Sequence, residues 1–497
     1  MARTLLDSNM GMARPRLLPV AFAASFLGAA GCIMYLNPHC DDGIHDGSET
    51  DIDCGGSCAR RCTIGFACDS GADCQSGVCA SGRCVPQPCF NGVQDNAETD
   101  IDCGGGTCRP CAGGRRCTTG ADCFNGQCET ASKVCYSLSS VSFATSGTYL
   151  AGSKPYALLA GDLDGDGNLD LVTANELEDS VTVLLGNGDG TFRRAAANFP
   201  TGEYPTGGAI ADFNLDGVPD VATANYHGNS VSILIGAGDG TLLPPVHYPT
   251  TAGAATSNLA VGDLDGDGYL DVVATNPEAG SISLLWGLPG GTLEPSLNVP
   301  VGPVGGHSSS APFSAAIGDF DGDGKNDVAV ADLIGRAVVV RLGAGGRALG
   351  PEVAHSEGGV GPFICMAGDV APDGKLDVVC SNRGSDDVSV LPGLGGGILA
   401  DPVVSGAGAG TGPYSLAVAD FNLDGAPDVV TANFLTGTAS VLLGVGDGRF
   451  EAPLSSGLVG DFTFGVATGD FNLDGRPDFA VCNATSNDVV VKLSTSQ

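Results

Sequence analysis

An acidic nine-residue motif that occurs seven times constrains the fold of this chain more than any other feature. Each copy reads Asp-x-(Asp/Asn)-x-Asp-Gly-x-x-Asp, except that the fifth copy has Ala371 at its third position. The copies are separated by 50 to 56 residues and begin at Asp162, Asp212, Asp263, Asp319, Asp369, Asp420 and Asp470. Such regular spacing indicates one supersecondary unit copied seven times, as in a propeller or a solenoid.

The composition fits an all-β chain. Of 497 residues, 78 are Gly and 28 are Pro, and only 16% are charged, which favours short strands and tight turns over helices. The formal net charge is −35. Nucleic acid and anionic lipid surfaces are therefore excluded as main partners, because both require clustered Lys and Arg.

The motif is typical of a loop that binds a hard divalent cation. Alternate carboxylates supply oxygens, the glycine at position six permits a sharp turn, and the carbonyl of position seven adds a further oxygen. Position twelve, which is acidic in an EF-hand, holds Thr173, Ala274 or Cys380 in three of the copies and no acid in any copy. Apolar residues bracket each motif, so we expect a calcium loop that joins two strands.

We predict up to seven Ca²⁺ sites, each formed by the side chains at positions one, three, five and nine and the carbonyl at position seven. The ligand sets are Asp162, Asp164, Asp166, Asn168 and Asp170; Asp212, Asn214, Asp216, Val218 and Asp220; Asp263, Asp265, Asp267, Tyr269 and Asp271; Asp319, Asp321, Asp323, Lys325 and Asp327; Asp369, Asp373, Lys375 and Asp377; Asp420, Asn422, Asp424, Ala426 and Asp428; and Asp470, Asn472, Asp474, Arg476 and Asp478. Asn at position three should weaken three sites, and the site at Asp369, which lacks a third-position oxygen, should be weakest.

Each loop is followed by a strand that ends in Asn or Asp, a third strand, a Gly-rich turn and a fourth strand. Four antiparallel strands form a propeller blade. The strings AxxDFNxDGxPD and VSxLxGxGDG resemble the FG-GAP or VCBS repeat family, which includes the N-terminal propeller of integrin α subunits. The resemblance covers residues from about 140 to the end and implies a calcium-binding propeller.

The ends of this region complement each other. The seventh copy stops after its third strand, at Val489 to Leu493, and residues 143–149 match the fourth-strand segment that begins at Phe192. We therefore expect an all-β fold, in which residues 140–497 form a closed seven-bladed β-propeller preceded by two small disulfide-rich modules.

Residues 1–31 resemble the signal peptide of a bacterial lipoprotein. Arg14 and Arg16 precede an uncharged run, and Ala29, Ala30 and Gly31 lead into Cys32. The resemblance implies cleavage before Cys32 and lipidation of that residue, so that the protein is exported and anchored at the cell surface or outer membrane, or else secreted. The alternative is an uncleaved anchor, because 20 apolar residues suffice to span a bilayer.

Sixteen cysteines between Cys40 and Cys135 form a duplication, with modules at residues 40–84 and 85–135 and ETDIDCGG in both. Eight cysteines in a short unit with few apolar residues favour disulfide staples from an oxidising compartment. Zinc is the alternative, although neither module has paired CxxC knuckles. We interpret the modules as a rigid stalk. In the propeller, Cys365 and Cys380 flank one hairpin, so they are either small core residues or partners in a disulfide.

An aromatic ring is expected on the face opposite the loops. Tyr156, Phe313, Phe363, Tyr414 and Phe464 each stand six residues before a motif, where two other copies have Thr206 and Ser257. At about 3.3 Å per residue they lie about 20 Å from the metal. They either pack between blades or form a floor that binds a glycan or a protein loop.

No HExxH, GxSxG or phosphate-loop motif is present. We therefore expect a non-catalytic cell-surface propeller for adhesion or for binding an extracellular protein or glycan. A surface lectin is the first alternative. A polysaccharide-acting enzyme is the second, and it rests on fold analogy alone.

Overall fold

The computed structural model describes residues 79–80, 83–84, 115–123, 127–135, 141–302 and 309–495. The predicted signal, Cys32 and nearly all of the first Cys-rich module lie outside the described residues. Among those described, no helix is both long and apolar enough to cross a bilayer.

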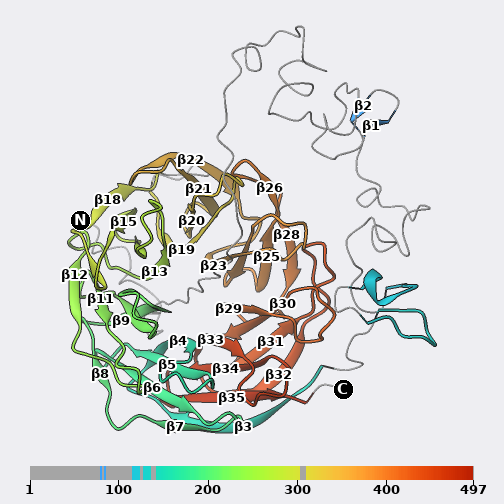
Figure 1. Cartoon of the computed structure of the whole chain (residues 1–497), viewed down its shortest axis with the longest axis horizontal. Coiled ribbons are helices and arrows are strands. Elements are labelled where there is room, and N and C mark those ends of the chain that lie inside the picture. Colours follow the sequence, from blue (N-terminus) through green and yellow to red (C-terminus); the bar gives the residue numbers. More distant parts are fainter. Residues whose placement is uncertain are drawn as a thin grey trace. The chain divides into compact units, whose positions relative to one another are not determined.

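Residues 141–302 and 309–495 form seven antiparallel sheets arranged in a ring (Figure 1). This confirms the expected seven-bladed β-propeller. The innermost strands are β4 (Pro155–Gly161), β9 (Pro205–Ala211), β13 (Asn258–Gly262), β19 (Pro312–Gly318), β23 (Pro362–Gly368), β29 (Pro413–Ala419) and β33 (Thr463–Gly469). The second strands are β5 (Asp170–Asn175), β10 (Asp220–Asn225), β14 (Asp271–Asn276), β20 (Asp327–Asp332), β24 (Asp377–Asn382), β30 (Asp428–Asn433) and β34 (Asp478–Asn483).

The outer half of each blade contains the third and fourth strands. The third strands are β6 (Ser180–Gly186), β11 (Ser230–Leu234), β15 (Ser281–Leu285), β21 (Ala337–Gly343), β25 (Asp387–Leu391), β31 (Thr438–Leu442) and β35 (Asp488–Ser494). The outermost are β7 (Phe192–Arg194) with β8 (Phe199–Pro200), β12 (Val246–Pro249), β18 (Leu297–Pro300), β22 (Leu349–Ser356), β28 (Val403–Gly406), β32 (Leu454–Leu458) and β3 (Phe143–Leu150). Blades 3 and 5 add the short pairs β16 (Gly287–Leu288) with β17 (Thr292–Leu293) and β26 (Gly393–Gly395) with β27 (Ile398–Leu399).

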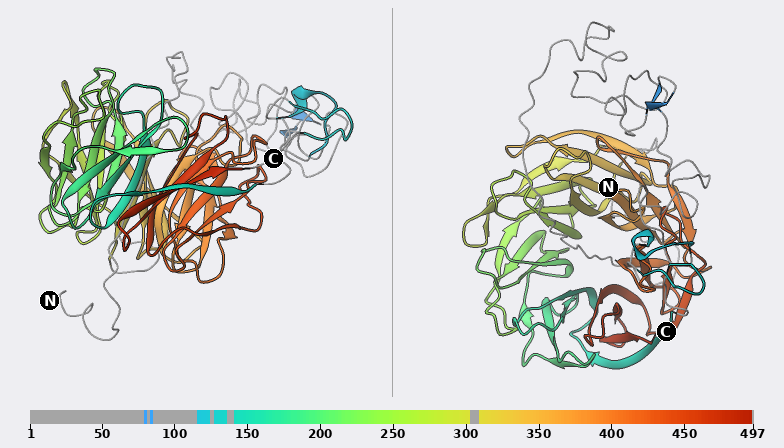
Figure 2. Two further views of the ribbon diagram at one scale, coloured as in Figure 1. Left: turned by 90° about the horizontal axis from the view of Figure 1, so that it is seen from below. Right: turned by 45° about the vertical axis from the view of Figure 1, so that its right-hand side comes forward.

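The core lies between the faces of neighbouring blades. Every residue of all seven second strands is buried, which explains their nearly continuous apolar sequence. Ile233 of blade 2, for example, packs in one cluster with Leu259 and Val272 of blade 3. The side view in Figure 2 shows the strands running across the thickness of the ring. Loops from first to second strands therefore lie on one face, together with the turns from third to fourth strands.

Strand β3 closes the ring. It pairs with β35 of blade 7, in a register that runs from Phe143 opposite Ser494 to Leu150 opposite Asp488, with a bulge between Thr145 and Gly147. The two strands lie side by side in Figure 1. The predicted completion of the last blade by residues 143–149 is thus confirmed.

The Asn at the end of the second strand fixes the following hairpin in most blades. In blade 2, Asn225 Nδ2 donates to Ser230 Oγ (3.0 Å) and to Ser232 Oγ (2.8 Å). Blades 1 and 6 repeat this pair of hydrogen bonds. The recurring Asn is therefore explained by the blade's own structure.

The described part of the second Cys-rich module contains the short 3₁₀ helix η4 (Gly120–Asp122) and two disulfides, Cys117–Cys128 and Cys123–Cys135. These pairs favour the disulfide interpretation over zinc. In the first module only the backbone pair β1 (Cys79–Ala80) with β2 (Arg83–Cys84) is described. Cys365 and Cys380, opposite each other in β23 and β24, form a third disulfide in the propeller.

Candidate metal centres and the opposite face

The acidic motifs form the loops that join first to second strands. In the first blade Asp162 directly follows β4, and Asp170 is the first residue of β5. The remaining six second strands also begin at the ninth-position Asp. The structure therefore places all seven predicted loops at equivalent positions on one face of the ring.

Three loops bring carboxylate oxygens together. Ligand atoms within 4.8 Å of one another come from positions one, three and nine of the first, third and fourth loops, namely Asp162, Asp164 and Asp170; Asp263, Asp265 and Asp271; and Asp319, Asp321 and Asp327. These are the copies with four acidic side chains. The fifth-position carboxylates are not in these groups, and in all seven loops Oδ1 of that residue accepts the N–H of position seven.

The loops with Asn at position three are organised differently. Asn214 Nδ2 donates to Asp216 Oδ2 (2.8 Å), and Asn422 and Asn472 make the equivalent hydrogen bond. The fifth loop has no side-chain oxygen at this position, and the N–H of Ala371 instead donates to Asp377 Oδ2 (2.8 Å). Among the described loops, the arrangement best suited to a cation is thus found in the first, third and fourth.

The ninth-position Asp has a structural role that the sequence did not reveal. Its Oδ2 accepts the N–H of position two at 2.7–3.0 Å in every loop. Its Oδ1 accepts, at 2.7–2.8 Å, the N–H of a residue that ends the third strand or lies two positions beyond its end. In blade 1 this residue is Gly186, where a Cβ would lie 2.3 Å from the carbonyl oxygen of Leu169. The carboxylate therefore ties the loop to the third strand.

The clusters are electrostatically suited to a positive ion. Burial, with a smaller contribution from the nearby charges of Asp164 and Asp162, raises the pKa of Asp170 to about 6, although hydrogen bonds from Gly186 and Leu163 oppose the shift. Burial and neighbouring carboxylates likewise raise the pKa values of Asp271 and Asp327 to about 6. Crowded carboxylates with raised pKa values would gain from a divalent cation, whose oxygen ligands are of this kind.

Basic side chains lie beside several loops. Lys375 and Arg476, both at position seven, form ion pairs with the fifth-position acids Asp373 (2.8 Å) and Asp474 (3.0 Å), and Lys325 pairs with Asp323. Arg347 reaches the third loop from the neighbouring blade. One sequence signal marks this arginine, which has no place in the predicted ligand sets: it stands where the equivalent turns of blades 1, 2, 3, 5 and 6 have glycine.

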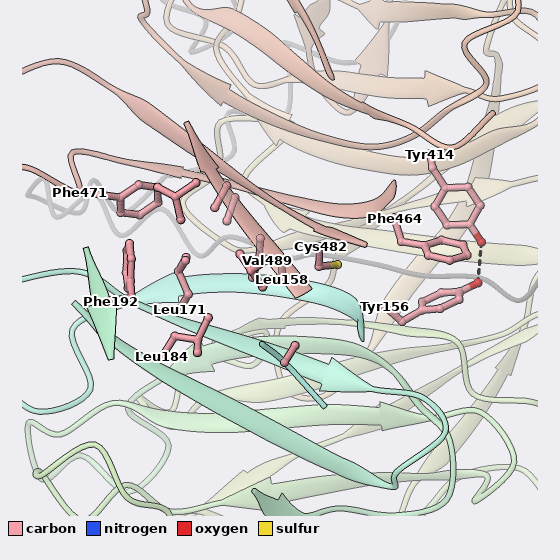
Figure 3. Close-up of a cluster of buried hydrophobic side chains, with 14 of the residues drawn as sticks. Tyr156, Leu158, Leu171, Leu184, Phe192, Tyr414, Phe464, Phe471, Cys482 and Val489 are labelled. Carbon is pink, nitrogen blue, oxygen red and sulfur yellow. Dashed lines mark hydrogen bonds between the residues drawn. The ribbon is translucent and has the colours of Figure 1, made fainter. Parts of the chain in front are cut away.

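The predicted aromatic ring lies on the innermost strands, at the ends opposite the loops. The rings of Tyr156 and Phe464 stack at 4.2 Å, and the Tyr156 hydroxyl lies 2.6 Å from the Tyr414 hydroxyl, as Figure 3 shows. The contacts continue from Tyr414 to Phe363 (5.0 Å) and from Phe363 to Phe313 (5.5 Å). The five aromatic residues thus form one connected cluster.

Tyr156 and Tyr414 are fully buried, Phe464 and Phe363 are nearly so, and Phe313 is partly exposed. This burial favours packing between blades as the role of most of the cluster, and leaves Phe313 as the member that a ligand can reach directly. Arg383, in the loop after β24, lies over the rings of Phe363, Tyr414 and Phe434, with its Cζ at 4.5 Å from the Phe434 centroid. A cation packed on three rings rigidifies this end of the inner strands.

Five overlapping stretches match the FG-GAP-like repeat, at residues 162–223, 212–274, 263–330, 369–431 and 420–481. Together they span more than half of the chain. The chain belongs to the FG-GAP-like repeat family. Each matched stretch starts at the first Asp of one loop and runs just beyond the next loop, so the family's repeat coincides with the loop-to-loop unit described above.

Solved structures similar to this FG-GAP-like protein include a lectin and a lyase. The BP39L lectin from Burkholderia pseudomallei is 17% identical, with a TM-score of 0.51, over 70% of this chain and 98% of that chain. Virginiamycin B lyase from Staphylococcus aureus is 9% identical, with a TM-score of 0.48, over 70% and 99%. No curated protein matches the sequence. At these identities the similarity shows the fold alone.

Proposed function

We propose that this FG-GAP-like protein is a non-catalytic, calcium-binding recognition propeller that binds an extracellular protein or glycan at the cell surface. The observation that carries this proposal is the repetition of an oxygen-rich acidic loop at the same strand junction in all seven blades. Seven equivalent loops on one face are better suited to binding one structural cation each than to forming a single reaction centre.

Calcium is the cation that the donor set favours. All side-chain donors of the clustered loops are oxygens, and flexible sets of carboxylates and carbonyls suit Ca²⁺ better than the strict octahedron of Mg²⁺. Asp162, Asp164 and Asp170 would hold the ion in the first loop, with the carbonyl of Asn168 and Asp166 as additional candidates. The bound ion would neutralise the crowded carboxylates and hold the loop against the blade.

The face opposite the calcium loops is the proposed recognition surface. Three large apolar side chains in its loops are more than half exposed, namely Leu177 (57%), Leu435 (59%) and Phe462 (52%). Phe462 contacts Phe434, and the guanidinium of Arg383 packs on the ring of Phe434. This surface therefore adjoins the aromatic cluster. Exposed apolar groups next to a rigid aromatic framework are typical of surfaces that bind partners.

Ligand capture by the full-length mature protein, with calcium and with excess chelator, tests the function. We expect a bound protein or glycan that is lost when Phe462 and Leu435 are both changed to Ser, and retained when Leu215 and Leu473, exposed leucines of the calcium loops, are changed in the same way. Selective binding on a glycan array would establish the lectin alternative. Turnover of a polysaccharide would contradict the non-catalytic proposal.

We also propose that the protein is exported and anchored through a lipid on Cys32, followed by a disulfide-rich stalk at residues 40–84 and 85–135. The support is the sequence pattern at residues 14–32. Mass spectrometry of the mature N-terminus should find an acylated Cys32, and a Cys32→Ala variant should leave the membrane fraction. A mature protein that retains residues 1–31 would contradict cleavage at this site.

A further inference from the structure

The turn between the third and fourth strands contains one exceptional residue. Its fifth residue is glycine in blades 1, 2, 3, 5 and 6, with φ between 72° and 82°: Gly190, Gly240, Gly291, Gly397 and Gly448. In blade 4 this position holds Arg347, with φ 67°. A non-glycine residue in this left-handed region is uncommon and calls for a compensating contact.

The turn packs on the preceding blade, which explains the glycines. A Cβ at Gly190, Gly240 or Gly397 would lie 2.4–2.5 Å from a side-chain atom of Leu493, Leu185 or Leu342, respectively. Each of these leucines directly precedes the first residue of the equivalent turn in the preceding blade. The equivalent residue of blade 3 is Trp286, the only tryptophan in the chain. The Arg347 guanidinium carbon lies 5.8 Å from the Trp286 ring centre. The two exceptional residues therefore meet at the junction of blades 3 and 4.

The guanidinium group is directed into the third acidic loop. Arg347 Nε donates to Asp265 Oδ2 at 2.7 Å, and Nη1 donates to Glu294 Oε1 at 2.7 Å. Nη2 is 3.6 Å from Asp267 Oδ2. Asp265, whose side chain is only 6% exposed, is the third-position residue of the carboxylate cluster with Asp263 and Asp271. A positive charge from blade 4 is thus hydrogen-bonded to a candidate metal ligand of blade 3.

The first loop provides an internal comparison. The first and third loops, DLDGDGNLD and DLDGDGYLD, differ only at position seven, and both form a carboxylate cluster. The basic residue nearest Asp164 is Arg193, whose Nη2 lies 3.8 Å from Asp164 Oδ2 and whose side chain is 63% exposed. An exposed pair at this distance is weak. The third loop therefore differs from the first mainly in its hydrogen-bonded guanidinium.

We propose that Arg347 is a resident cation of the third loop, which holds blades 3 and 4 together without metal and lowers the affinity of this loop for Ca²⁺ below that of the first loop. The inference rests on the proposed binding of Ca²⁺ by the acidic loops. From its sequence alone, the third loop would be among those with the highest affinity for Ca²⁺. Under this proposal it is one of the weak sites.

Two physical effects act in this direction. The guanidinium engages one oxygen of Asp265 with the planar donor geometry that suits carboxylates. Its fixed charge also repels a divalent ion, and a unit charge about 6 Å away in water-like surroundings changes affinity about tenfold. Both effects are weaker in the first loop, where the basic residue is the exposed and more distant Arg193.

The test uses terbium as a luminescent calcium substitute. Tyr269 is the only aromatic residue at position seven among the seven loops, so sensitised emission reports on the third loop, and a Tyr269→Phe variant sets the background. The variants are Arg347→Gly, which restores the residue of the other blades, and Arg347→Gln, which removes the charge but retains a long side chain. Arg193→Ala is the matched control. Displacement of terbium by Ca²⁺ gives the affinity of this loop.

We expect Arg347→Gly and Arg347→Gln to lower the half-displacing Ca²⁺ concentration about tenfold, and Arg193→Ala to leave it unchanged. An unchanged value in both Arg347 variants would overturn the proposal, as would the absence of Tyr269-dependent emission from every variant. Total bound calcium, measured by equilibrium dialysis of the same samples, separates the two proposals. Calcium bound by the remaining loops would leave the proposed function standing, whereas none bound would contradict it as well.

Discussion

At the residue scale, the side chains of the acidic motif have two roles, and in the clustered loops the ninth-position Asp takes part in both. The ninth-position Asp is hydrogen-bonded to two backbone N–H groups in every blade, whereas the third-position Asp of the clustered loops faces the other carboxylates. The first role fixes the loop to the blade, and the second creates the site for the cation. The two roles can be separated experimentally.

Asp164→Asn should reduce the stabilisation by calcium and leave the metal-free protein nearly unchanged. Asn keeps the oxygen that accepts the N–H of Asp166, as Asn214 does in the second loop, but it removes one charge from the cation site. The expected loss in Ca²⁺-dependent unfolding free energy is up to about 1.4 kcal/mol, the value of one site with ten times its dissociation constant of free ion. Asp189→Asn, an exposed acid of the same blade outside the cluster, is the charge-matched control. An equal loss in the control would contradict a specific role for Asp164.

Calcium stabilisation should also depend on pH. Burial and neighbouring carboxylates raise the pKa values of Asp170, Asp271 and Asp327 to about 6, above their ordinary value of 3.8. Between about pH 4 and 6 the metal-free fold thus binds more protons than the unfolded chain, so its stability falls as the pH rises through this window. Calcium requires the ionised carboxylates, so its contribution grows over the same window.

We therefore expect the difference in melting temperature between calcium and EDTA samples to be largest at pH 7.5 and to shrink below pH 6. Scanning calorimetry at pH 7.5, 6.5, 5.5 and 5.0 measures it. A difference that stays constant down to pH 5.0 would show that these carboxyl groups do not participate in binding.

At the element scale, β3 is the strand on which closure of the ring depends. Its pairing with β35 covers the outer edge of blade 7 and joins residues more than 300 positions apart in sequence. Deletion of residues 1–150 should expose this edge, cost on the order of 1 kcal/mol per lost backbone hydrogen bond, and promote self-association through the free strand. Deletion of residues 1–140 keeps β3 and is the control. Chemical unfolding and size-exclusion chromatography compare the two, and equal stability and size would contradict the sealing role.

Most of the fold could be predicted from the sequence because each blade is formed mainly by residues that are consecutive in the chain. The loop motif, the apolar strands and the matching segment at residues 143–149 specify strand order and ring closure, and the structure confirms both. Contacts between blades were harder to predict. The hydrogen bond from Arg347 to Asp265 spans 82 positions, and its existence depends on how two blades pack.

The same limit applies to the aromatic ring and to the ninth-position Asp. Spacing placed the aromatic residues at one end of the inner strands, but only the packing of the blades determines that Tyr156, Phe464 and Tyr414 contact one another and become buried. The carboxylate of Asp170 reaches a backbone N–H 16 residues away, and no side-chain pattern marks this partner. Backbone hydrogen bonds of this kind are determined by three-dimensional structure alone.

At the scale of the whole molecule, the propeller carries all seven acidic loops on one face. Repulsion among these carboxylates works against the compact fold, and bound cations would relieve it. Stability should therefore rise with the number of occupied loops, up to about 10 kcal/mol if all seven bind with dissociation constants near 0.1 mM at about 1 mM free Ca²⁺. Such a gain is comparable to the total stability of an ordinary domain.

The most direct test is the thermal unfolding of the full-length mature protein during a Ca²⁺ titration that starts in excess EDTA. We expect the melting temperature to rise by roughly 5 °C or more by 1 mM free Ca²⁺, and the metal-free ring to be loosened or unfolded. A melting temperature that is the same in EDTA and in 1 mM Ca²⁺ would contradict the central claim that the acidic loops bind calcium and stabilise the propeller.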